Sequence, residues 1–283
     1  MQKNILVTGA TGNIGSALLP LLAGSTHKIW AGSTKGQTLQ GTPGRAIDFL
    51  NPATLSQAFE GIQTLFVVIP LHPQMVLMAT NVANAAKAAG VTHIVRVSGA
   101  GADPQSPVAV ARVQGEIDAQ LKNSGIRCTF LQPKNFMQNY IQFYPGMIKQ
   151  GQFYSSQGEG KIAFIDAEDI AKVAAQVILH PERHIQSAYV LTGPQALTNQ
   201  EVLAMIDAAT GRKTQWIGIP ESAAVESMKQ MGMPDFVVDV MSSLNQIIAA
   251  GYVAETTDCV QQVTGQAPRH FEDFIRTHAA VWK

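Results

Sequence analysis

The chain has 283 residues, enough to bury a large core, and its length fits one α/β domain with a smaller lobe. Twenty basic side chains balance twenty acidic ones, so the composition argues against a nucleic acid partner. No stretch approaches the roughly 20 apolar residues of a membrane span, and Cys128 and Cys259 show neither disulfide nor metal-ligand spacing. These features predict a cytoplasmic protein that binds neither nucleic acid nor membrane.

Apolar runs that favour β-strands alternate with helical segments along the first half of the chain. The expected strands are Asn4–Gly9, His27–Gly32, Arg45–Phe49, Gln63–Ile69, Thr92–Ser98 and Arg127–Pro133. The expected helices are Ile14–Leu22, Pro52–Phe59, Pro73–Ala89 and Val108–Asn123. Strands this apolar, separated by helices, predict an α/β fold with a doubly wound parallel sheet of the Rossmann type. The connection Ser33–Gly44 is too rich in glycine and threonine for a confident helix, and we expect it to be irregular.

Beyond Pro133 the alternation loosens. A helix is expected to begin near Asp166 or Asp169, which serve as its cap and first-turn charge rather than as a catalytic dyad. A strand near residues 187–192 could return to the main sheet, and Thr198 and Glu201 have capping-box spacing before the next helix. We therefore expect two domains, residues 1–133 and a smaller, mostly helical lobe over residues 134–283 that is partly interleaved with the first.

The stretch VTGATGNIG places glycines at the junction of the first strand and the first helix. There Gly9 can take the backbone angles of a tight turn, Gly12 lets a pyrophosphate approach the main chain, and Gly15 lets the helix lie close to the sheet. Thr11 and Asn13 add side-chain donors, and the helix N-terminal amides face the anion. A plain strand-to-helix turn is the alternative. The residues expected to hold the pyrophosphate are Gly9, Thr11, Gly12, Asn13, Ile14 and Gly15.

The end of the second strand indicates which dinucleotide binds. In a Rossmann unit an acidic residue at this place holds the adenosine ribose and favours NAD. This chain instead offers Ser33, Thr34 and Lys35, and no carboxylate before Asp48. We therefore expect NADP(H) in preference to NAD(H), with an ordinary solvated loop as the alternative.

The GxxGxxG spacing of the glycine motif resembles that of the atypical short-chain dehydrogenases/reductases. Three further segments resemble the NmrA-like branch of that superfamily, which includes quinone and triphenylmethane-dye reductases: AIDFLNPATLSQAFEGIQTLFVV, KNSGIRCTFLQPKNFMQN and IAFIDAEDIAKVAAQVILHPERHIQSAYVLTGPQALTNQE. The resemblance runs from about Asn4 to Arg212. It implies a Rossmann domain followed by a substrate lobe, and an oxidoreductase activity.

The resemblance also implies further cofactor contacts at the ends of later strands. It places Asp48 and Phe49 beside the adenine, and Ile69 and Pro70 along the cofactor. It places Ser98 and Gly99 on the nicotinamide side, and Pro133 and Phe136 near the nicotinamide and the substrate mouth.

The usual catalytic pair of short-chain dehydrogenases is missing from the sequence. None of the five tyrosines is followed four residues later by lysine, so alcohol or ketone chemistry through a Tyr-x-x-x-Lys pair is not expected. Many NmrA-like reductases carry a histidine where this chain has Gln114. That glutamine could hydrogen-bond a substrate oxygen or be an ordinary packing residue, and the proton donor is not identified. No metal site is expected, because Pro181 interrupts the spacing of His180 and His184.

Hydride transfer without a dedicated acid remains feasible when the acceptor is a conjugated molecule that stabilises the incoming charge. The segment after Pro133 offers aromatic and amide surface suited to such a flat ligand, although some of its residues must be core. We expect an NADPH-dependent reductase of small aromatic or conjugated molecules, in a protein that could form a homodimer. The alternative is a non-catalytic NADP(H)-sensing regulator that binds a protein partner. The expected substrate contacts are Asn135, Met137, Tyr140, Phe143 and Tyr144.

Overall fold

The computed structural model describes residues 2–184 and 187–283. The chain divides into two compact units, the first formed by Met1–Pro133 and Ala167–Val190, the second by Lys134–Asp166 and Leu191–Lys283. The division at Pro133 is the one expected from the sequence. The segment Ala167–Val190 belongs to the first unit, so the lobe is interleaved with it. The sequence suggested this return only for the strand near residues 187–192, and in the structure α7 (Ala167–Leu179) returns as well.

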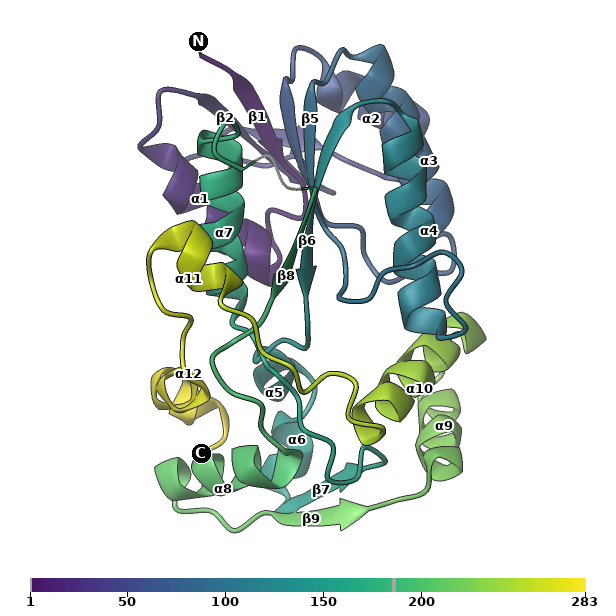
Figure 1. The fold of residues 1–283 in the computed structure, drawn as a ribbon, viewed down its shortest axis with the longest axis vertical. Helices are drawn as coiled ribbons and strands as arrows, with labels where there is room; N and C mark the ends of the chain where they lie inside the picture. Colours follow the sequence, from purple (N-terminus) through teal and green to yellow (C-terminus); the bar gives the residue numbers. More distant parts are fainter. Residues whose placement is uncertain (1, 185–186) are drawn as a thin grey trace. The chain divides into compact units, whose positions relative to one another are not determined.

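The first unit is built on a seven-stranded sheet with the order β3-β2-β1-β4-β5-β6-β8 (Figure 1). The strands are β1 (Asn4–Val7), β2 (Lys28–Ser33), β3 (Gly44–Ala46), β4 (Thr64–Val67), β5 (His93–Val97), β6 (Arg127–Pro133) and β8 (Ala188–Leu191). The pairs from β3 to β6 are parallel. Between β6 and β8, the Phe130 amide donates to the Ser187 carbonyl, and the Lys134 amide donates to the Leu191 carbonyl. The bonded positions increase in the same direction along both strands, so this pair is parallel too. The predicted Rossmann-type sheet is confirmed.

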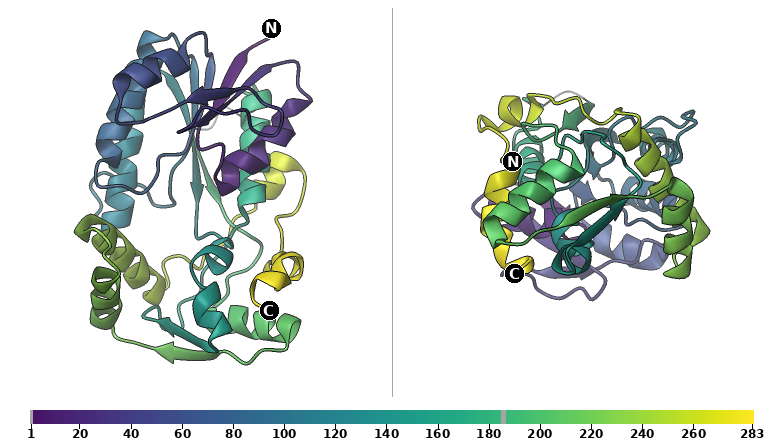
Figure 2. Two further views of the ribbon diagram at one scale, coloured as in Figure 1. Left: turned by 180° about the vertical axis from the view of Figure 1, so that it is seen from behind. Right: turned by 90° about the horizontal axis from the view of Figure 1, so that it is seen from below.

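Helices cover both faces of this sheet (Figures 1 and 2). On one face α1 (Asn13–Ala23) packs against α7 (Ala167–Leu179). On the other, α3 (Met75–Ala88) packs between α2 (Pro52–Phe59) and α4 (Ala109–Asn123). Every residue of β4 and β5 is buried as a result, which explains why these strands read as continuous apolar runs and not as alternating ones.

The third strand is shorter than the expected Arg45–Phe49, because local side-chain bonds replace sheet pairing after Ala46. The Asp48 carboxylate accepts the Leu50 amide at 2.9 Å, and the Asn51 side chain accepts the Ala53 amide at 3.1 Å as the N-cap of α2. Such bonds favour a turn over a strand. The preceding connection contains no helix, as expected, and only an isolated bridge joins Leu39 to Thr42.

The second unit is mostly helical. Its helices are α5 (Asn139–Gln142), α6 (Pro145–Lys149), α8 (Asn199–Thr210), α9 (Glu221–Gln230), α10 (Asp235–Ala249), α11 (Cys259–Thr264), α12 (Phe271–His278) and the 3-10 helix η1 (Ala279–Val281). A two-stranded parallel sheet joins β7 (Gln152–Ser155) to β9 (Gln215–Gly218). The predicted capping box of Thr198 and Glu201 is present at α8, which ends at Gly211 in the left-handed conformation.

An aromatic core holds the second unit together. Tyr140 lies edge-on to Phe164 and Phe271, with ring centroids 5.7 and 5.4 Å apart, and stacks with Phe153 at 5.9 Å. The fully buried Trp282 donates its indole N–H to the Tyr140 carbonyl at 3.0 Å. Aromatic pairs at these separations add to the stabilisation from area burial. The end of the chain is therefore part of this core.

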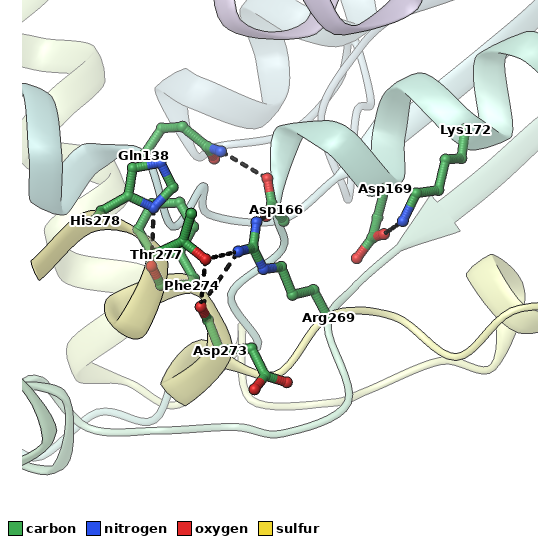
Figure 3. A network of polar contacts seen from close by, with 9 residues as sticks. All are labelled: Gln138, Asp166, Asp169, Lys172, Arg269, Asp273, Phe274, Thr277 and His278. Atoms are coloured by element: carbon green, nitrogen blue, oxygen red, sulfur yellow. Dashed lines mark hydrogen bonds and ion pairs between the residues drawn. The ribbon is translucent and has the colours of Figure 1, made fainter. Parts of the chain in front are cut away.

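The two aspartates near the start of α7 form ion pairs with different basic side chains (Figure 3). Asp166, in the second unit, has no exposed surface, accepts the Gln138 amide at 2.7 Å and pairs with Arg269 at 3.0 Å. Asp169, in the first turn of α7 as predicted, pairs with Lys172 at 2.8 Å. Their separate pairing agrees with the interpretation that they are not a catalytic dyad. Sequence analysis did not predict the buried contacts of Asp166.

Among the described residues, no helix has both the length and the apolar character needed to cross a bilayer.

His93 on β5 is a buried neutral histidine whose ring lies 2.9 Å from the Thr129 hydroxyl. Burial lowers its pKa from 6.5 to about 4, and the charges of Arg127 and Lys3 act in the same direction. Because the unfolded chain protonates this ring at higher pH than the folded one does, its contribution to stability is complete above about pH 6.5 and is lost as the pH falls towards about 4.

We predict that acidification destabilises the protein more than it destabilises the variant His93→Gln, which keeps a hydrogen-bonding amide but has no titrating ring. Between about pH 7 and about pH 4.5 the free energy of unfolding of the wild type should fall by roughly 2.5 kcal/mol more than that of the variant. Denaturant unfolding at each pH measures the difference. Parallel pH curves would contradict the assignment.

Candidate functional site

The first turn after β1 is shaped by the carbonyl group of Gly9. Gly9 has φ +61°, and its carbonyl accepts the Gly12 amide at 2.9 Å. A Cβ atom at Gly15 would lie 2.3 Å from the same oxygen, so no other residue fits there. The expected role of Gly9 in a tight turn is confirmed. The atoms nearest to such a Cβ at Gly15 belong to Gly9 and Ala10, in the turn that follows β1.

This turn leaves the N-terminus of α1 open to an anion. The N-cap residue Gly12 has no side chain to accept the first-turn amides, and both it and Thr11 are exposed. Uncapped helix N-termini with exposed glycine backbone bind phosphate groups, because the amides and the helix dipole both face the anion. The side chain of Ile14 is buried, so its expected contribution is limited to the backbone. These features fit the pyrophosphate of a dinucleotide.

The turn after β2 presents hydroxyl and ammonium groups. The Ser33 hydroxyl is buried, accepts the Gly36 amide at 3.1 Å and donates to the Gln37 side chain at 3.3 Å. Thr34 and Lys35 are exposed. Ser33 therefore stabilises the turn, and the other two side chains are accessible to a ligand.

The remaining expected contacts of the first unit follow other strands of the same sheet. Because the strands are parallel, the residues after β1, β2, β4, β5 and β6 all lie at one edge of it. This edge brings together the glycine turn, residues 33–35, residues 69–70, residues 98–99 and Pro133. Asp48 and Phe49 follow the end of β3 in a turn and not in a strand, Asp48 exposed and Phe49 half-buried. Phe136 belongs to the second unit.

A buried polar network joins β5 to α4 in the first unit. Arg96, whose side chain is 1% exposed, forms an ion pair with Asp118. Asp118 also accepts the Ser98 hydroxyl at 2.7 Å, and Arg96 donates to the Gln114 side-chain oxygen at 2.5 Å. Burial raises the pKa of Asp118, while Arg96 and Ser98 act in the opposite direction. The expected residues Ser98 and Gln114 are thus held by two charged residues that sequence analysis missed.

The sequence contains a signal that Arg96 is paired, although it does not identify the partner. Arg96 stands between apolar residues in the run THIVRVS, and a strand buried on both faces can hold a guanidinium only if a carboxylate neutralises it. Asp118 lies on the helix that follows this strand, on the turn next to Gln114.

Two of the expected substrate contacts lie in the core of the second unit. Met137 and Tyr140 are each 1% exposed, and the Tyr140 hydroxyl donates to Asn199 at 2.6 Å. Burial raises the pKa of Tyr140 and also that of Tyr144. Packing in the core of the second unit covers both side chains, which argues against the expected substrate contacts of Met137 and Tyr140. Asn135, Phe136 and Tyr144 are half-buried, and Phe143 is 70% exposed.

In the part of the chain that the structure describes, no cluster of three or more histidine, cysteine, aspartate or glutamate side chains could hold a metal ion.

Comparison with known proteins assigns this architecture to a family. The sequence profile of the NmrA-like family matches residues 1–275. The NAD(P)H azoreductase of Xenophilus azovorans is 41% identical over 283 residues, covering 98% of this chain and 99% of the relative.

Two solved structures have the same fold over nearly the whole chain. The NADPH complex of the Escherichia coli NADPH-dependent quinone oxidoreductase QOR2 has a TM-score of 0.83 and 28% identity, covering 97% of this chain and 99% of the other. The triphenylmethane reductase of Citrobacter sp., complexed with NADP(H), has a TM-score of 0.82 and 24% identity, covering 97% and 99%. The last similarity concerns the fold alone.

These relatives confirm the expected family and the expected class of enzyme, an oxidoreductase with a nicotinamide cofactor. The chain belongs to the NmrA-like family.

Proposed function

We propose that this protein is an NADPH-dependent reductase that transfers hydride to conjugated small molecules such as quinones and azo compounds. The observation that carries the proposal is the open glycine turn at the N-terminus of α1, at the sheet edge where the other expected cofactor residues gather. The similarity to an NAD(P)H azoreductase over the full chain length supports the choice of acceptor.

The proposed cofactor contacts divide by the part of the nucleotide they bind. The amides of the glycine turn bind the pyrophosphate, and Thr34 and Lys35 bind the 2'-phosphate of the adenosine ribose. Ser98, Gly99 and Pro133 border the nicotinamide. The other proposed contacts are Asp48, Phe49, Ile69, Pro70 and Phe136.

The bound reduced nicotinamide supplies a hydride. The protein's own residues position the reactants and exclude water. None of the tyrosines forms a Tyr-x-x-x-Lys pair that could donate a proton. Tyr140 and Tyr144 are poor acids because burial raises their pKa values. An acceptor that delocalises the incoming charge requires no strong acid, which favours quinones and azo compounds over simple ketones. Asn135, Phe143 and Tyr144 remain as proposed acceptor contacts.

We predict that the purified protein oxidises NADPH when a quinone or an azo dye is added, and does not reduce a simple aliphatic ketone. Loss of NADPH absorbance and chromatography of the products measure both reactions. A protein that binds NADPH but reduces neither class of acceptor would contradict the proposal and favour the non-catalytic NADP(H)-sensing regulator. A pull-down with and without cofactor then tests for a partner.

The glycine turn gives a prediction that separates binding from folding. In Gly12→Ala the new Cβ lies 3.3 Å from the nearest atom, so the chain should fold while the NADPH dissociation constant rises about 10-fold or more. In Gly15→Ala the 2.3 Å contact should lower the free energy of unfolding by about 2 kcal/mol or more. NADPH fluorescence titration and denaturant unfolding measure the two effects.

The matched control is Gly24→Ala, at the C-terminus of the same helix, where a Cβ meets nothing within 4 Å. It should leave NADPH binding unchanged. Wild-type affinity in Gly12→Ala would show that no pyrophosphate lies on this turn.

Lys35 gives a prediction about the choice between NADPH and NADH. The variant Lys35→Glu places a negative charge where the 2'-phosphate is proposed, so the NADPH dissociation constant should rise about 10-fold or more while that of NADH changes less than about 2-fold. The exposed Lys87, in the last turn of α3, provides the control Lys87→Glu. Equal losses for both cofactors in Lys35→Glu would argue against this assignment.

A further inference from the structure

The Gln114 side chain is held in one orientation by a group that can only donate hydrogen bonds. The Arg96 guanidinium donates to Gln114 Oε1 at 2.5 Å and to the Gln114 backbone carbonyl at 3.4 Å. A guanidinium has no acceptor atom, so the amide atom that faces it must be the oxygen. The amide nitrogen Nε2 therefore points away from Arg96.

Arg96 itself has no freedom to move. Its side chain is 1% exposed and is paired with the buried Asp118. Separating such a pair would leave a buried charge uncompensated. The helix that carries Gln114 is also fixed, because at the next residue, Gly115, a Cβ would come within 2.2 Å of Pro104 N in the loop after β5.

The Gln114 side chain lies over the end of β5. A Cβ built on Gly99 would be 3.3 Å from Gln114 Cγ, so this glycine leaves space for the glutamine. The neighbouring Ser98 hydroxyl already donates its hydrogen to Asp118 at 2.7 Å and has none left for a ligand. Gln114 Nε2 makes no hydrogen bond to another described residue, and the side chain is half-buried.

We propose that Gln114 Nε2 is a fixed, neutral hydrogen-bond donor that binds a heteroatom of the acceptor, with Arg96 and Asp118 as positioning residues. The inference rests on the proposed reductase function and narrows its substrate class. It favours acceptors that carry a nitrogen or oxygen at the reduced end of the conjugated system, as azo compounds and quinones do. An acceptor that takes the hydride at a carbon without a heteroatom, such as a triphenylmethane cation, gains nothing from this donor.

The reaction balances without a proton from the protein. A quinone takes a hydride and one solvent proton and becomes the hydroquinone, and an azo group takes a hydride on one nitrogen and a solvent proton on the other and becomes the hydrazine. In both, NADPH is oxidised to NADP⁺. Gln114 keeps its own protons and stabilises negative charge on the heteroatom that awaits the solvent proton.

The test compares Gln114→Leu with the wild type on three acceptors: an azo dye, a quinone and a triphenylmethane dye. Loss of a donor to a heteroatom that becomes charged should lower kcat/KM for the azo dye and the quinone by about 10- to 100-fold. The value for the triphenylmethane dye should change less than about 3-fold. In Gln114→Glu, both side-chain oxygens are acceptors, so the azo dye and quinone should be affected at least as strongly.

A binding measurement and a matched variant complete the test. In the presence of NADP⁺, the azo dye should bind Gln114→Leu about 3- to 10-fold more weakly than the wild type, while NADPH affinity stays unchanged. Gln120→Leu removes a half-buried glutamine of the same helix, which contacts Thr80, and should leave all three activities unchanged.

The outcomes separate the two proposals. Equal losses on all three acceptors, or wild-type activity in Gln114→Leu, would overturn the role of Gln114 and leave the reductase standing. A wild type that reduces none of the acceptors would overturn the proposed function itself.

Discussion

The position of one backbone carbonyl, that of Gly9, determines how the first helix can begin. Its φ of +61° turns the oxygen towards the start of α1, where the Gly12 amide binds it and only a glycine fits at position 15. The helix N-terminus that results is uncapped and lies directly after β1. Because β1 lies between β2 and β4, the ends of these two strands flank the turn, and the ends of β5 and β6 follow beyond β4.

The second constraint is the ion pair of Arg96 with Asp118. Moving two charges out of water costs several kcal/mol per ion, which a purely apolar contact between β5 and α4 would avoid. The pair has a consequence that apolar packing could not have, because it fixes the direction of two neighbouring polar groups. Ser98 must donate to Asp118, and Gln114 must present its oxygen to Arg96. The ion pair therefore fixes the orientation of the polar groups at the end of β5.

Local signals in the sequence predicted much of the first unit and little of the second. Three features depend on residues close together in the chain and could therefore be predicted from the sequence. They are the glycine turn, α2 at Pro52–Phe59 and the capping box of Thr198. The contacts of Arg96 with Asp118 and of Asp166 with Arg269 join distant positions, and nothing local identifies the partner. The burial of Met137 and Tyr140 could not be predicted for the same reason, since a large apolar residue that lines a pocket and one that fills a core have the same local pattern.

The polar groups at the end of β5 also limit the chemistry of the proposed reductase. The Ser98 proton is bound by a carboxylate, and the Gln114 amide does not ionise near neutral pH. The Tyr140 and Tyr144 hydroxyls hold their protons more tightly than usual, because burial raises their pKa values. None of these four groups is suited to giving a proton to a substrate in step with hydride transfer. On the proposed function, an acceptor that spreads the incoming charge over a conjugated system is therefore favoured over a simple ketone, because it can hold the hydride until a solvent proton arrives.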